Sequence, residues 1–95
     1  MPPKHTLAEI VQESSFTEQF DSISTKYKRL EDVHAGLDWA LARDPKQGTV
    51  VDGKIRVFKT TAVGETPGFW VLYKYDEEAH KVHYLALKPI QSKEF

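Results

Sequence analysis

Two stretches in the first half of the chain carry apolar residues at the three- and four-residue spacing of an amphipathic helix. The apolar positions of the first stretch are Phe16, Phe20, Ile23, Tyr27 and Leu30. The second stretch runs from residue 30 to 42, and its apolar positions are Val33, Leu37, Ala40 and Leu41. Asp44-Pro45 and Gly48 follow, a combination that ends a helix. The spacing therefore predicts two helices joined as a hairpin.

The residues before the first helix predict a short strand and a capped helix start. Leu7 to Val11 is a strand-like apolar run. Ser15 is followed three residues later by Glu18, which is the pattern of a capping box. In this motif the serine hydroxyl and the glutamate carboxylate each accept a hydrogen bond from an otherwise unpaired backbone N–H. We therefore expect Ser15 and Glu18 to cap the first helix.

After Gly48 the pattern changes to the two-residue period of β-strands. Residues 49–51 and 54–59 flank Asp52-Gly53, a turn signal, so they form either a tight hairpin or one bent strand. Residues 69–75 start apolar on both faces, which predicts a central strand. Residues 81–87 form the last strand, and Pro89 keeps it from continuing in a central position.

These elements predict an α+β fold with the order β-α-α-β-β-β, in which the helical hairpin covers one face of a three- or four-stranded antiparallel sheet. A chain of 95 residues has room for one hydrophobic core, so residues 1–95 are expected to form a single domain with residues 1–6 as a loose terminus. The expected core consists of Phe16, Phe20, Ile23, Leu37, Leu41, Val57, Val71 and Leu85.

The amino-acid composition limits the kinds of reactive and metal-binding groups that the chain can have. The chain has no cysteine, which excludes disulfides, thiol nucleophiles and cysteine-based zinc sites. No signal peptide or membrane-length apolar run is expected, so we expect a cytoplasmic protein. His80 and His83 lie three residues apart, but without a further ligand pattern they do not predict a metal site. We expect neither a metal nor a cofactor.

Several local sequences resemble the RelE/ParE superfamily, the toxins of type II toxin–antitoxin systems. Residues 39–45, Trp-Ala-Leu-Ala-Arg-Asp-Pro, precede Gly48 as they do in such toxins, and residues 68–76 pair across a short acidic turn with residues 82–87. The order of elements is also that of the superfamily. The resemblance covers about residues 7–95. It implies a toxin-like protein whose partner is a cognate antitoxin.

The resemblance also implies which residues could contact RNA. Members that cut mRNA on the ribosome use basic residues on the sheet and an Arg, Lys or Tyr near the C-terminus. By position, Arg56, Lys59, Trp70 and Lys93 become candidates for binding RNA or a partner, and His83 and Lys88 become candidates for catalysis. Three positions depart from the active pattern, because Trp70 and Pro89 stand where arginine is common and Phe95 stands in place of a catalytic tyrosine.

Strand geometry limits how these candidates combine. Arg56 and Lys59 are three residues apart and therefore lie on opposite faces of a regular strand, as do the neighbours His83 and Tyr84. We expect Tyr84 in the core, whereas His83 is either functional or a solvated polar residue. Trp70 is either a core residue or, if exposed on the uncovered face, a binding anchor. Arg56 and Lys59 either contact phosphate or are solvated charges.

The charge distribution favours a modest affinity for nucleic acid. The net charge is −1, with six Lys or Arg against nine Asp or Glu in residues 1–53 and seven against five in residues 54–95. Dedicated nucleic-acid-binding domains usually carry a clear basic excess. Three toxin-like functions remain open: an mRNA interferase, a gyrase poison, or a degenerate member with weak or no activity. A non-catalytic protein-interaction module is the alternative from another class.

Overall fold

The computed structural model describes residues 7–62 and 64–90. It contains seven elements: β1 (Glu9–Gln12), α1 (Ser14–Ser24), α2 (Leu30–Arg43), β2 (Thr49–Asp52), β3 (Ile55–Lys59), β4 (Phe69–Asp76) and β5 (Lys81–Pro89). The expected loose terminus, residues 1–6, lies outside the described residues. None of the helices in this part of the chain is long and apolar enough to span a membrane.

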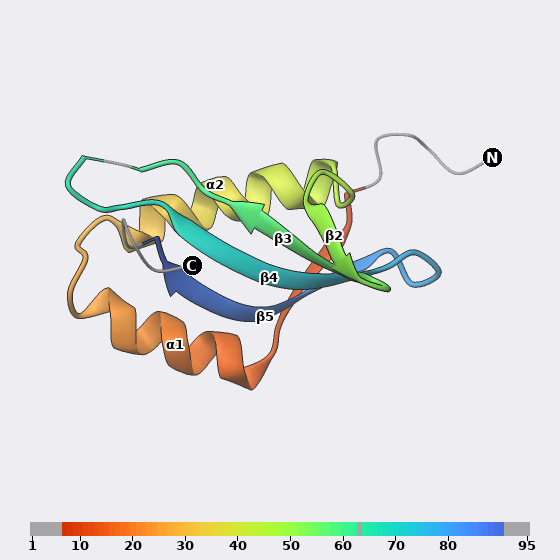
Figure 1. Cartoon of the computed structure of the whole chain (residues 1–95), viewed down its shortest axis with the longest axis horizontal. Helices are drawn as coiled ribbons and strands as arrows, with labels where there is room; N and C mark the ends of the chain where they lie inside the picture. The colour runs from red at the N-terminus through yellow and green to blue at the C-terminus, as the bar shows by residue number, and fades with distance from the viewer. Residues whose placement is uncertain (1–6, 63, 91–95) are drawn as a thin grey trace.

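The five strands form one sheet in the order β1-β5-β4-β3-β2 (Figure 1). Neighbouring strands from β2 to β5 are antiparallel, whereas β1 pairs parallel with β5. The expected α+β architecture is confirmed, but the sheet has five strands and is mixed. The turn at Asp52-Gly53 makes a tight hairpin of β2 and β3, with Gly53 at a φ of 56° that suits glycine.

The hydrophobic core lies between the helices and one face of β4 and β5. Helix α2 lies behind the sheet in Figure 1 and crosses this face. Its contribution is Leu30, Val33, Leu37 and Leu41, and α1 contributes Phe16. The sheet contributes Phe69, Val71, Tyr73, Val82, Tyr84 and Leu87. Tyr84 is fully buried, as expected, and its ring centroid lies 4.9 Å from that of Phe16.

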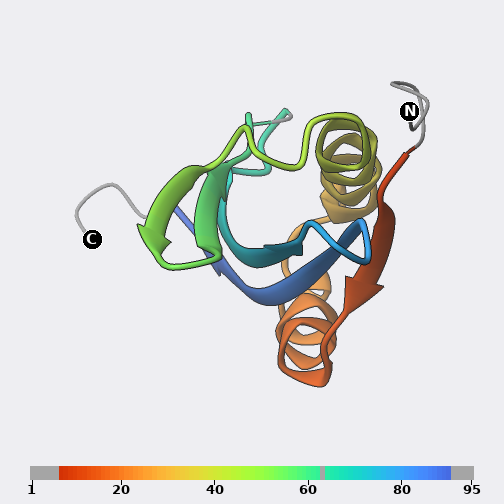
Figure 2. The same ribbon diagram turned by 90° about the vertical axis from the view of Figure 1, so that its right-hand side faces the viewer.

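Helix α1 also covers the edge of β5. Strand β1 pairs with residues 81–84 only, so the next backbone groups of β5 need other partners. The hydroxyl of Ser15 donates to the carbonyl of Leu85 at 2.6 Å, and the backbone N–H of Leu87 donates to Oε1 of Gln19 at 2.7 Å. Two side chains of α1 thus replace a neighbouring strand. Figure 2 shows α1 and α2 as separate rods on either side of β1.

The expected capping box is wrong, because Ser15 donates its hydroxyl to β5. The N-cap of α1 is Glu13, whose side chain makes no capping hydrogen bond. Two members of the expected core are also wrong. Val57 and Leu85 are only half-buried, since the strand register turns Val57 away from α2 and Leu85 is a bulge residue. Phe20 and Ile23 are partly buried and pack against the core from its margin.

Candidate nucleic-acid interface

One face of the sheet, here called the open face, is turned away from α2. Residues that pair across strands share a face, so the register assigns each side chain. The core residues Val71 and Tyr73 alternate along β4 with residues of the open face. The residues of the open face include Thr49, Ile55, Val57, Lys59, Trp70, Leu72, Lys74, His83, Ala86 and Lys88. In Figure 1 it is turned toward the viewer.

A tryptophan with a lysine on each side lies at one end of the open face. Trp70 pairs with Lys59 of β3 and with Lys88 of β5. The Lys59 ammonium lies 5.8 Å from the centroid of the Trp70 ring, within the range of a cation–π interaction. Both lysines are exposed, and Trp70 is half-buried. We call these three residues the Lys–Trp–Lys cluster.

An apolar groove adjoins the cluster toward the free edge of the sheet. It has a volume of about 380 Å³ and is lined by Thr49, Val51, Val57 and Trp70. Strand β2 forms this edge, and all four of its residues are exposed. Val51 is 56% exposed, which is unusual for a β-branched apolar residue. The groove therefore presents apolar surface beside two cations.

His83 lies on the same face as Lys88 because β5 contains a bulge. Two residues five apart on a regular strand point to opposite faces. Here Leu72 pairs with Ala86 and Tyr73 with Tyr84, so Leu85 is an extra residue and the alternation restarts after it. His83 pairs with Lys74, and Lys88 pairs with Trp70, four residues away along β4. The two lie roughly 13 Å apart along the strand at the usual rise per residue.

The side chain of His83 is held by a glutamate. Its Nδ1 lies 2.9 Å from Oε2 of Glu13, the residue between β1 and α1. Sequence reasoning missed Glu13, because nothing in the spacing of residues 13 and 83 indicates that they meet. The signal is topological, since it depends on the parallel pairing of β1 with β5.

The remaining candidates lie elsewhere. Arg56 pairs with Tyr73 and so faces the helix side, opposite to Lys59, as the strand spacing predicted. Its guanidinium donates to the carbonyls of Lys46 and Gly48 at 2.9 and 2.8 Å, and so fixes the loop before β2. Lys93 lies outside the described residues. The structure thus brings together Lys59, Trp70 and Lys88, and it separates Arg56 from them.

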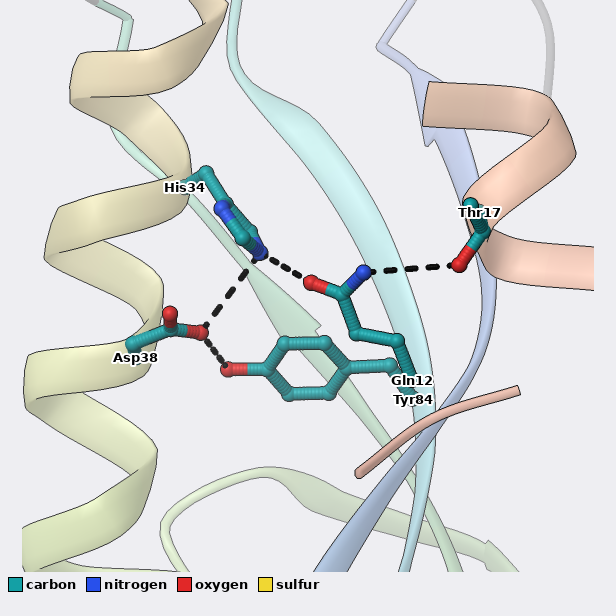
Figure 3. Close-up of polar contacts among 5 residues, drawn as sticks. All are labelled: Gln12, Thr17, His34, Asp38 and Tyr84. Atoms are coloured by element: carbon teal, nitrogen blue, oxygen red, sulfur yellow. Dashed lines mark hydrogen bonds and ion pairs between the residues drawn. The ribbon is translucent and has the colours of Figure 1, made fainter. Parts of the chain in front are cut away.

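A second polar group connects four elements on the helix side of the sheet (Figure 3). The hydroxyl of Tyr84 donates to Oδ1 of Asp38 at 2.6 Å. His34 lies 3.7 Å from the same carboxylate oxygen and donates to the amide oxygen of Gln12. The Gln12 amide nitrogen reaches Thr17 at 3.4 Å. We call this set the interhelical network, since it links β1, α1, α2 and β5.

The interhelical network has the features of a structural element. Burial raises the pKa of Tyr84 above its ordinary value, and the hydrogen bond to Asp38 raises it further. Tyr84 is therefore a hydrogen-bond donor with no tendency to ionise at neutral pH. Among residues 7–62 and 64–90, no group of three or more His, Asp or Glu side chains is placed to hold a metal ion.

The fold has a solved counterpart. A chain of the toxin–antitoxin complex RelBE2 from Mycobacterium tuberculosis superposes with a TM-score of 0.70. The match covers 90% of this chain and 93% of that chain, at 12% sequence identity. No protein-family model matches the chain, and no curated protein matches it. At such low identity the similarity establishes the RelE-like fold and leaves activity to be argued from the residues.

Proposed function

We propose that the chain is the toxin-like component of a type II toxin–antitoxin pair and that it binds single-stranded RNA on the open face. The observation that carries this proposal is the Lys–Trp–Lys cluster on the uncovered face of a RelE-like fold. A solved chain of the same fold belongs to a toxin–antitoxin complex, which supports an antitoxin as partner.

The cluster has the chemistry of a contact site for one nucleotide step. A base that stacks on an aromatic side chain gains about 1–3 kcal/mol without regard to its identity. The half-buried Trp70 offers a fixed ring for this contact. Lys59 and Lys88 flank the ring and are exposed, so that phosphates on either side of a stacked base meet a cation. The adjoining apolar groove gives room for a second base.

Cleavage of the bound RNA is slow or absent. Attack of a 2′-OH on phosphorus needs a base, an acid for the leaving oxygen and cations for the developing charge. The cluster supplies cations only, because the indole of Trp70 and the adjacent Pro89 do not titrate. Loss of a general acid or base costs on the order of 10²–10⁴ in rate. A toxin of this kind acts mainly by occupying its RNA target.

The proposal is tested by binding and by growth. Trp70→Ala and the double variant Lys59→Ala/Lys88→Ala each lower affinity for a single-stranded oligonucleotide by at least tenfold in a fluorescence-anisotropy titration. Lys28→Ala, an exposed lysine between α1 and α2, is the matched control and leaves affinity unchanged. Expression of the chain alone slows growth, and Trp70→Ala relieves the effect. Equal affinity in all four proteins would refute an RNA site at the cluster.

A protein-interaction module is the second candidate, and the edge of the sheet favours it. Val50 and Val51 are 51% and 56% exposed on β2, and Trp39 of α2 is 62% exposed. An extended peptide can add to such an edge and place one side chain in the groove beside Trp70. Under this alternative, Val51→Lys abolishes binding to the partner, whereas Lys59→Ala/Lys88→Ala does not change it and RNA affinity is negligible.

A further inference from the structure

Helix α2 carries a row of four exposed residues on the side turned away from the core. They follow one another at spacings of four, three and four residues, so they lie along one line of the helix. The row consists of Asp32, Gly36, Trp39 and Arg43. At 62% exposure, Trp39 is the most exposed large hydrophobic side chain of residues 7–62 and 64–90. We call these four residues the outer row.

The tryptophan of the outer row is held in place by the arginine one turn further on. The guanidinium carbon of Arg43 lies 4.2 Å from the centroid of the Trp39 ring, and its Nη1 donates to the Trp39 carbonyl at 3.0 Å. A large side chain whose orientation is already fixed loses little conformational entropy on binding. Tryptophan is also among the residues that dominate the energy of protein interfaces. Trp39 therefore has the properties of an anchor for a protein partner.

Gly36 supplies the space that such an anchor needs. Among the described residues outside its own helix, no atom lies within 4 Å of the point where a Cβ would stand. The packing of the chain therefore does not require a glycine there, although glycine in the middle of a helix is less stable than alanine. Beside it lies a groove of about 260 Å³ between α2 and β3, whose lining includes Val33, Ala40 and Phe58.

The order of residues in the outer row makes it complementary to a copy of itself. A two-fold axis through the middle of the row runs two copies of α2 antiparallel, so that their helix dipoles also oppose each other. Trp39 then lies opposite the partner subunit's Gly36, and Asp32 lies opposite the partner subunit's Arg43. The largest side chain meets the smallest residue, acid meets base, and each contact occurs twice. This symmetry selects a second copy of the chain as the partner.

We propose that the chain forms a homodimer through antiparallel packing of α2 on α2 of the partner subunit. Trp39 enters the groove beside the partner's Gly36, and Arg43 pairs across the axis with the partner's Asp32. Within one chain this carboxylate pairs with Arg29 at 2.9 Å in an exposed ion pair, so it can accept a second guanidinium. The contact follows a helix of 14 residues, about 20 Å long, which suits a concentration-dependent dimer.

The dimer leaves the candidate RNA interface accessible. In Figure 1 the open face is turned toward the viewer and α2 lies behind the sheet. Two subunits joined at α2 therefore present two open faces, one on each side of the assembly. Dimerisation neither requires nor blocks the proposed RNA binding.

Sedimentation equilibrium of the whole chain without RNA measures the dimer directly. The wild-type chain shows a monomer–dimer equilibrium, and Trp39→Ala raises its Kd by about 30-fold or more, the range for a tryptophan hot spot. Asp32→Arg and Arg43→Asp each place like charges across the axis and raise the Kd by about tenfold or more. Glu31→Arg makes the same charge change one position away from the outer row and leaves the Kd unchanged.

An exchange of charges tests the antiparallel register. Mixed in equal amounts, the Asp32→Arg and Arg43→Asp proteins form a heterodimer, because opposite charges then meet at both contacts. The double variant Asp32→Arg/Arg43→Asp recovers the homodimer for the same reason. Loss of folding in either single variant would not be repaired by the other, so this recovery is specific to the interface.

Three results would overturn the dimer at α2. One is a wild-type chain that stays monomeric up to about 1 mM. Another is a dimer that neither Trp39→Ala nor the charge variants weaken. The third is a dimer that Val51→Lys abolishes instead, because the contact would then lie at the edge strand β2. The double variant Lys59→Ala/Lys88→Ala leaves the Kd of the dimer unchanged, so a failure of RNA binding and a failure of dimerisation are distinguishable.

Discussion

At the scale of single residues, Tyr84 connects the core to the interhelical network. Its ring is fully buried, and its hydroxyl donates to Asp38 at 2.6 Å. A hydrogen bond to a charged group contributes about 1.5–3 kcal/mol to stability. When the Tyr84 hydroxyl is removed, water can take its place at the partly exposed Asp38 carboxylate and offset part of this loss. We therefore expect Tyr84→Phe to lower the free energy of unfolding by about 1–2 kcal/mol in a urea titration. Asp38→Asn should cost a similar amount, whereas a change near zero for both would show that the network contributes no stability.

Two buried tyrosines should make the fold less stable at alkaline pH. Burial raises the pKa of Tyr73 and of Tyr84 above the ordinary value. An unfolded tyrosine loses its proton near pH 10, while the folded chain still holds both protons. The unfolded state then binds fewer protons, so the stability is complete below about pH 10 and falls as the pH rises further. Urea midpoints at about pH 8 and about pH 11 measure this, and Tyr84→Phe should make the fall shallower.

At the scale of elements, α1 completes the sheet edge with side chains. Gln19 accepts a hydrogen bond from the N–H of Leu87, at a point where β1 has already ended. A buried N–H without a partner costs about 1–3 kcal/mol. Gln19→Ala should therefore lower stability by about that amount and increase the hydrogen-exchange rate of the Leu87 amide. Glu18→Ala, one position earlier on the exposed face of α1, should change neither.

The elements themselves were largely readable from hydrophobic spacing. The second helix and the central strand are where the pattern placed them, and of the two alternatives left open at Asp52-Gly53 the structure has the hairpin. Helix α1 ends at Ser24, before the last two apolar positions of the predicted first helix. Tyr27 reaches the core from the turn after α1, and Leu30 reaches it from the start of α2. The misassigned core residues Val57 and Leu85 have another cause. Both depend on strand register, which is set by long-range pairing and by a bulge.

The candidate site was readable only in part, for the same reason. The lysines of the cluster follow from the resemblance, and the opposite facing of Arg56 and Lys59 follows from strand geometry. The meeting of His83 with Glu13 joins positions 70 residues apart in sequence. No local pattern encodes such a contact, and it becomes visible only once the parallel strand pair is known.

At the scale of the whole molecule, the weak net charge of −1 limits long-range attraction to RNA. Binding then depends on the few lysines that meet phosphate directly. For two contacts, the logarithm of the association constant should fall with the logarithm of salt concentration with a slope of about −1.4, at about −0.7 for each single-strand phosphate contact. Lys88→Ala should bring the slope to about −0.7. An unchanged slope would remove Lys88 from the interface.

The bulge at Leu85 reverses which residues of β5 face the helices, so that odd and even positions exchange faces on passing it. Upstream of it, odd-numbered His83 faces out and even-numbered Tyr84 faces in; downstream, even-numbered Lys88 faces out and odd-numbered Leu87 faces in. If Leu85 took a place in the ladder instead of bulging, Lys88 would turn beneath α2 and Leu87 would face water, while His83 stayed in place. The shared facing of His83 and Lys88 therefore depends on Leu85 staying out of the ladder rather than on the residue types on either side of it.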